Sequence, residues 1–275
     1  AEGWAWDGAS TLTLNGINLS TSSAKALIVP ANTTIELVGD NQIESTQASG
    51  GASYGIYGAD GLTIGGTGTL TVTGGATNAA SSPANNSYGI YVNSGTITIN
   101  SGIINATGGT SANGQSIGIT TYNGAVMING GTVTATGGTA NGFSGSSWGL
   151  SGTWNGGGNV IVSGGTLITN TSSSTTENCG IRTNNFTVSG IGTSVQSSGE
   201  SLGFYVLSNL TVSGGANVTG TAKDSTLLSS AGFGAENINI SGNNTVVTAN
   251  GGDIINNNGY SYGISLGYSG TLTID

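Results

Sequence analysis

A repeated segment constrains the fold of this chain more than any other feature of its sequence. Ser53–Gly75 recurs with substitutions at Ser87–Gly109 and at Ser116–Gly138, and a further copy begins at Ser147. Each copy holds three short runs rich in Val, Ile, Thr and Tyr, and Gly-rich corners separate them, which is typical of β-strands. Self-similarity at periods of roughly 20–50 residues indicates a solenoid. The sequence therefore predicts an all-β fold: a right-handed parallel β-helix with three short strands per coil and about nine coils.

The repeats divide the chain into two parts. Residues 1–22 are predicted to form an N-terminal cap and a partial coil, and residues 23–275 to form the repeats. Trp4 and Trp6 fit a cap over the open apolar end of the solenoid, and a sugar platform is the alternative. One glycine recurs in the first strand of each copy, at positions 55, 89, 118, 149, 180, 203 and 263. The doubled spacing before Gly263 predicts that the coil beginning near Leu227 lacks this glycine and has a weak first strand.

Period-2 alternation assigns residues to the two faces of each strand. In the first copy it predicts that five residues point inward: Ile56, Leu62, Ile64, Leu70 and Val72. Tyr54, Tyr88 and Trp148 share the parity of the inward isoleucines and are predicted to fill the core or a corner. Tyr57 and Tyr91 have the opposite parity. Because coils stack about 4.8 Å apart, these two are predicted to form a stacked, exposed pair that either binds sugar rings or packs for stability alone.

Charge excludes several classes of function. The chain has 3 Lys and Arg residues, no His and a formal net charge of −9, so no basic patch for nucleic acid can form. No apolar run is long enough for membrane insertion. The 12 acidic residues are scattered and share no repeat column, and His, the commonest general base, is absent. We therefore predict no enzymatic activity and no cofactor, with a weak cation site at Glu36, Asp40 and Glu44 as an open alternative.

A single cysteine, Cys179, rules out a disulfide within the chain. It occupies the repeat position that Tyr54, Tyr88 and Trp148 hold in other copies. A buried cysteine behaves as a small hydrophobic residue. The repeat position therefore predicts a buried thiol, with a reactive thiol as the minority alternative.

Three segments carry a family resemblance: GWAWDGASTLTLNGINL, TTIELVGDNQI and YGIYGADGLTIGGTGTLTVTGG. They resemble repeat-rich β-helix surface proteins of Gram-positive anaerobes, which are similar to a carbohydrate-binding family that binds cellulose and pectin. The resemblance covers nearly the whole chain. It implies a secreted protein, either extracellular or associated with the cell wall.

These observations together predict a non-catalytic adhesin or carbohydrate-binding stalk module whose partner is a polysaccharide or a cell-surface glycan. Tyr57, Tyr91 and Trp154 are the candidate sugar-binding residues. A self-assembling subunit of a filament or surface layer is the alternative, and a lyase-like enzyme or an ice-binding protein is less well supported. The run Thr271–Ile274 matches a second strand without its third, which predicts an edge at Leu272 and Ile274. Such an edge is covered by further coils of a longer protein, docks another copy end to end, or precedes disordered residues.

Overall fold

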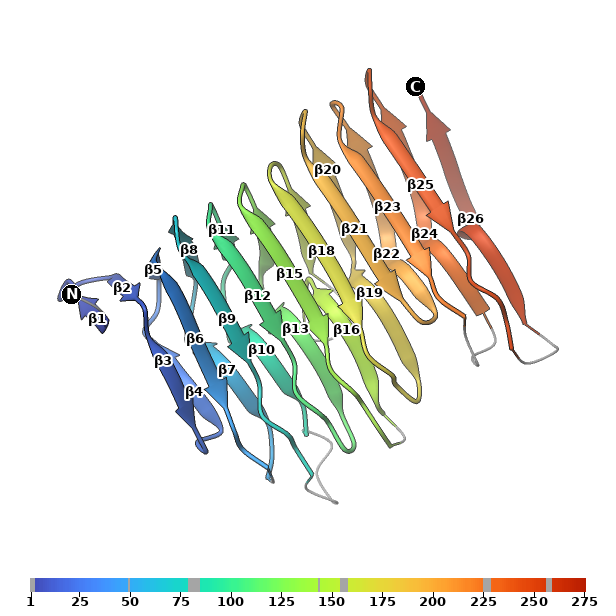
Figure 1. The fold of residues 1–275 in the computed structure, drawn as a ribbon. Helices are drawn as coiled ribbons and strands as arrows, with labels where there is room; N and C mark the ends of the chain where they lie inside the picture. The colour runs from blue at the N-terminus through green and yellow to red at the C-terminus, as the bar shows by residue number, and fades with distance from the viewer. Residues whose placement is uncertain are drawn as a thin grey trace.

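The chain forms a parallel β-helix, in which successive coils stack from the N-terminus to the C-terminus (Figure 1). The computed structural model describes residues 3–48, 50–78, 85–142, 144–153, 158–224, 229–255 and 259–275. No α-helix occurs within these ranges, and so none that could cross a membrane. The prediction of an all-β solenoid is confirmed.

Three strand positions recur along the stack. The first-position strands are β4 (Lys25–Val29), β7 (Ser53–Gly58), β10 (Ser87–Val92), β13 (Gln115–Thr121), β16 (Ser146–Ser151) and β19 (Glu177–Thr183). The second-position strands are β2 (Thr11–Asn15), β5 (Thr33–Val38), β8 (Leu62–Gly66), β11 (Ile97–Ile99), β14 (Ala125–Ile128), β17 (Asn159–Val162) and β20 (Asn185–Ser189). Near the C-terminus, single long strands run through both positions: β22 (Leu202–Ser213), β24 (Ser229–Ser241) and β26 (Tyr260–Ile274).

The third-position strands form a separate sheet that has nine strands among the described residues. They are β3 (Asn18–Thr21), β6 (Asp40–Ser45), β9 (Thr69–Thr73), β12 (Ile103–Thr107), β15 (Thr132–Gly137), β18 (Thr166–Thr171), β21 (Ser194–Gly199), β23 (Asn217–Ala222) and β25 (Val246–Asn250). All pair in parallel with the equivalent strand of the next coil. Thr71, Asn105 and Thr134 therefore form one column, as the repeat predicts.

The main core runs inside the solenoid. All five residues predicted to point inward in the first copy lie in it, and none is more than 1% exposed. Full burial of an aliphatic side chain stabilises the fold by roughly 1.5–3 kcal/mol. Repetition of this burial in successive coils provides the continuous core that a single repeat could not form alone.

Serine hydroxyls and asparagine amides join neighbouring coils. The Ser87 hydroxyl, fully buried, donates to the carbonyl of Gly75 (2.7 Å) and accepts from the amide of Gly109 (2.8 Å). On the outer surface, an asparagine ladder links the starts of four successive second-position stretches, at Asn159, Asn185, Asn209 and Asn237. The Nδ2 of Asn185 donates to Oδ1 of Asn159 (2.9 Å), that of Asn209 to Asn185 (3.0 Å), and that of Asn237 to Asn209 (3.2 Å).

The N-terminal segment adds the one antiparallel pairing among the described strands. Here β1 (Gly3–Trp6) pairs with β2, and Trp6 packs against the main core. Trp4 instead is 70% exposed. Trp4 and Trp6 also line an apolar hollow of about 530 Å³ together with Leu12, Leu27 and Ile28.

The alternation of faces breaks within each first-position strand. In β7, Gly55 and Ile56 are consecutive and both buried. A Cβ atom on Gly55 would overlap Val72 of the main core, so this glycine also faces inward. Two successive inward residues place Tyr54 and Tyr57 together on the outer face. Tyr88 and Trp148 are buried, as expected of residues that fill the core or a corner. The predicted shared parity with the inward isoleucines is wrong, because Tyr54, Tyr88 and Trp148 pack in a second cluster that is separate from the main core.

The coil predicted to lack its repeated glycine retains it. In β24, Ala231 pairs with Leu202 of β22, and Phe233 pairs with Phe204. Gly232 therefore matches Gly203, and the prediction of a lost glycine is wrong. The sequence is misleading here because β24 carries Ala231, Gly234 and Ala235 where other coils carry larger residues. Leu227 itself lies outside the described residues.

Candidate functional site

The outer side of the first-position strands carries a largely buried apolar cluster, which we name the aromatic face. It comprises Tyr54, Tyr57, Tyr88, Tyr91, Ile117, Trp148, Cys179, Leu202 and Tyr205. Parallel register stacks these residues in two columns, so the ring of Tyr54 lies 5.2 Å from that of Tyr88, and Tyr57 lies 5.7 Å from Tyr91. An inward pair, a glycine followed by a large hydrophobic residue such as Ile56, Leu150 or Phe204, is what brings the two columns onto one face.

The predicted pair of Tyr57 and Tyr91 is stacked, with an interplanar angle of 24°. It is not an exposed pair, because Tyr91 is only 7% exposed. The rings of Tyr54 and Tyr88 lie within 5.2 Å of Tyr91 and cover it. That arrangement follows from the broken alternation, which places four tyrosines together.

The remaining predicted site residues lie elsewhere. Trp154 falls outside the described residues. Leu272 and Ile274 lie on β26 and are 43% and 68% exposed. Their role in self-association remains a prediction, which sizing the protein across a concentration series would test.

Three tyrosines of the aromatic face have raised pKa values. Burial raises the pKa values of Tyr54, Tyr88 and Tyr91, and the neighbouring tyrosines raise them further. The Tyr88 hydroxyl accepts a hydrogen bond from Nδ2 of Asn86 (2.8 Å). At one end of the face, Nζ of Lys25 lies 3.4 Å from the centre of the Tyr57 ring. This is a cation–π contact.

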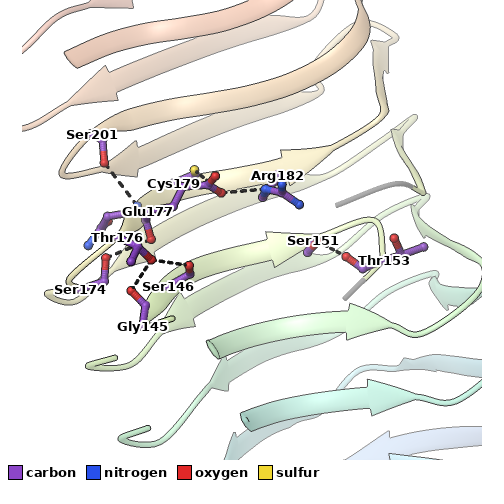
Figure 2. Close-up of polar contacts among 11 residues, drawn as sticks. Gly145, Ser146, Ser151, Thr153, Ser174, Thr176, Glu177, Cys179, Arg182 and Ser201 are labelled. Carbon is purple, nitrogen blue, oxygen red and sulfur yellow. Dashed lines mark hydrogen bonds and ion pairs between the residues drawn. The ribbon is translucent and has the colours of Figure 1, made fainter. Parts of the chain in front are cut away.

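A second cation lies farther along the same face. Nε of Arg182 pairs with Oε1 of Glu177 at 2.7 Å, as Figure 2 shows. Its guanidinium group also lies 4.6 Å from the centre of the Trp148 ring and 5.6 Å from that of Tyr205. Arg182 therefore combines an ion pair with two cation–π contacts.

The thiol of Cys179 lies next to the carboxylate of this ion pair. Cys179 is fully buried, which confirms its predicted burial, and its Sγ donates to Oε1 of Glu177 (3.4 Å). Burial raises the pKa of the thiol, and the carboxylate of Glu177 raises it further. Because the thiolate is the reactive form, these effects disfavour a reactive cysteine.

A groove of about 640 Å³ opens where the aromatic face reaches β22, β24 and β26. Ala231 and Gly234 of β24, which pair with Leu202 and Tyr205 of β22, form its floor. Larger side chains of the strands on both sides form its walls: Leu202, Tyr205 and Leu207 on β22, and Tyr262 and Leu266 on β26. Since β22 and β26 are two coils apart, roughly 10 Å, the missing side chains of β24 leave a slot between them.

The groove is elongated along the strand direction. Ser229 lines one end and Glu236 the other, seven residues later on the same strand. At about 3.3 Å per residue, these ends are on the order of 20 Å apart. Glu177, whose register position matches that of Ser229 through β22, lines the first end. The slot therefore fits an extended chain better than a single small ring.

The groove residues were missed from the sequence. Their signal is the segment AGFGAE at 231–236, which matches LGFYVL at 202–207 once Gly232 is paired with Gly203. The paired segments show that β24 lost the side chains that fill the same surface in β22. A search for strong hydrophobic residues overlooks such a strand.

Metal ligands are not clustered in the described part of the chain, where no group of three or more His, Cys, Asp or Glu side chains could hold an ion. Glu36, Asp40 and Glu44 thus do not form such a group. Comparison of the chain with models of protein families, with curated proteins and with solved structures gave no match. The groove is the feature from which a function can be inferred.

Proposed function

We propose that the protein is a non-catalytic, extracellular or cell-surface β-solenoid that binds polysaccharide in the groove over β24. The observation that carries this proposal is a slot with a floor of small residues between walls that contain Tyr205 and Tyr262. Tyrosine offers an apolar ring and a polar hydroxyl, a combination that suits the face and edge of a sugar. The volume falls within the range of about 300–1,000 Å³ that is usual for ligand sites.

The position of the groove carboxylates supports binding rather than hydrolysis. Glycoside hydrolysis generally uses two carboxyl groups about 5–9.5 Å apart. Glu177 and Glu236 lie near opposite ends of the groove, on the order of 20 Å apart along the strands. Glu177 is also held in its ion pair with Arg182. The geometry thus favours a groove that holds a chain without cleaving it.

The location of the groove on the outer side of the solenoid, away from the main core, also supports a role in adhesion. A ligand in the groove contacts side chains of three successive coils while the core stays intact, so a long polymer can lie across the solenoid. The resemblance to repeat-rich surface proteins supports the proposed location outside the cell. Tyr57 and Tyr91 then serve mainly to support the aromatic face.

Filling the groove tests the proposal. A Cβ atom on Gly234 would have ordinary contacts, with Cδ2 of Leu202 and the carbonyl oxygen of Phe204 each at 3.5 Å. Gly234→Tyr therefore extends the column of Tyr205 into the slot without forcing the backbone apart. Gly51→Tyr is the matched control, because a Cβ atom on exposed Gly51 has no neighbour within 4 Å.

The measurement is calorimetric titration with neutral, cationic and anionic oligosaccharides. We expect the wild type and Gly51→Tyr to bind at least one of them, and Gly234→Tyr to bind it at least about tenfold more weakly. Equal binding by Gly234→Tyr would move the site away from the groove. A wild-type protein that binds no member of the panel would refute the proposed function.

A further inference from the structure

The groove is acidic in the part of the chain that the structure describes. Its ionisable carboxylates are Glu177 and Glu236, and no Lys or Arg lines it. Arg182 offsets the charge of Glu177 through the 2.7 Å ion pair. No such cation pairs with Glu236 among the described residues, so the negative charge is concentrated at the Glu236 end.

The carboxylate of Glu236 is held in place at that end. Its Oε1 accepts a hydrogen bond from the Ser269 hydroxyl (3.0 Å). A Cβ atom on Gly267 would overlap the carboxylate, so the absence of a side chain at 267 leaves the space that the carboxylate occupies. Both Glu236 and Gly267 line the groove. A half-buried, oriented carboxylate of this kind is prepared to accept charge-assisted hydrogen bonds from a ligand.

The aromatic face already holds positive groups over its rings. Lys25 lies over Tyr57, and Arg182 lies near both Trp148 and Tyr205. Tyr205 also forms part of the groove wall. A ligand cation that entered the groove would therefore meet a fixed carboxylate and the same kind of ring surface that binds the cations of the protein itself.

We propose that the groove selects polysaccharides built from amino sugars with free ammonium groups, and that Glu236 binds one of these groups. This inference rests on the proposed function. Neutral glycans lack the group that Glu236 would bind. Polymers of uronic acids would bring negative charge toward this carboxylate and toward a protein of net charge −9, which opposes association.

The experiment compares three oligosaccharides of equal length by calorimetry, at a pH that keeps glucosamine protonated. They are a glucosamine oligomer, its fully N-acetylated counterpart and a galacturonate oligomer. We expect the glucosamine oligomer to bind at least about tenfold more tightly than the acetylated one, a difference of about 1.4 kcal/mol. Galacturonate should bind most weakly, and the preference for glucosamine should shrink in high salt.

Two variants separate the specific contact from general attraction. Glu236→Gln should lose the preference for glucosamine but keep its affinity for the acetylated oligomer, which also shows that the groove is still folded. Asp40→Asn makes the same change of charge on β6, outside the groove lining, and should leave the preference intact.

The outcomes distinguish this proposal from the one on which it rests. Equal affinity of the wild type for the glucosamine oligomer and for its N-acetylated counterpart, at low and at high salt, would overturn amino-sugar selection and leave a groove for neutral glycans. An unchanged preference in Glu236→Gln would overturn the role of this carboxylate. Absence of binding to every oligosaccharide would refute glycan binding itself.

Discussion

Gly203→Ala should destabilise the fold, whereas Gly234→Ala should stabilise it. Gly203 is the repeated glycine of β22, and Gly234 lies on β24 in the groove floor. A Cβ atom on Gly203 would lie 2.5 Å from the carbonyl oxygen of Gly232 and 2.6 Å from the amide nitrogen of Thr221. Both are backbone atoms of neighbouring strands, so rotation of a side chain cannot relieve the overlap. At Gly234 the nearest atoms are 3.5 Å away, an ordinary contact distance.

The magnitudes follow from these distances. Overpacking a well-packed site usually costs about 1–3 kcal/mol. Gly203→Ala should reach or exceed the upper end, about 3 kcal/mol, because strands must move by almost 1 Å to restore normal contact. Gly234→Ala fits without strain and reduces the freedom of the unfolded chain, so it should stabilise the fold by up to about 1 kcal/mol.

Equilibrium urea unfolding, followed by far-ultraviolet circular dichroism, measures both effects. Because coils contact only their neighbours, hydrogen exchange in β21–β24 checks that the loss in Gly203→Ala is local. Equal midpoints for Gly203→Ala and the wild type would refute the close approach of the strands. Strong destabilisation by Gly234→Ala would show that the groove floor has no free space.

Three further predictions concern the core, the ladder and the aromatic face. Phe204 is the middle ring of three, 5.2 Å and 4.6 Å from its neighbours, and Phe204→Ala should cost about 3–5 kcal/mol in urea unfolding. Asn185 donates to one ladder neighbour and accepts from the next, so Asn185→Ala should cost about 1–2 kcal/mol; no shift in midpoint would contradict a stabilising ladder. Burial raises the pKa values of Tyr54 and Tyr88, so their contribution to stability should be complete below about pH 10 and be lost as the pH rises above it. Absorbance at alkaline pH should show these phenols ionising together with unfolding, and ordinary titration before unfolding would contradict the burial.

The repeat allowed most of the fold to be predicted. Leu70 and Val72 lie in strictly alternating strands, so their parity identifies the inner face without other information. Ile104 was as predictable, because parallel register places it beside Leu70. The alternating runs of the first copy, Tyr54–Tyr57, Leu62–Ile64 and Thr69–Thr73, differ from the bounds of β7, β8 and β9 by at most two residues at either end.

The aromatic face and the groove could not be predicted in the same way. The step that places Tyr54 outward depends on Gly55, which approaches the third strand closely because it has no side chain. Period-2 counting cannot reveal that approach. At Ala231 and Gly234 the informative feature is a missing side chain, and its meaning depends on which larger residues flank it in the coils before and after.

The asparagine ladder from Asn159 to Asn237 has an electrical consequence for this part of the solenoid. The backbone amides of Asn209 and Thr271 donate to Oδ1 of Asn185 and Asn237, and this fixes which side-chain atom is the acceptor. Each ladder amide therefore points its nitrogen toward the N-terminal end and its oxygen toward the C-terminal end. Parallel dipoles in a row add and polarise one another. The surface thus carries a line of aligned dipoles along the solenoid axis, positive toward the N-terminus, in the same sense as the macrodipole of an α-helix.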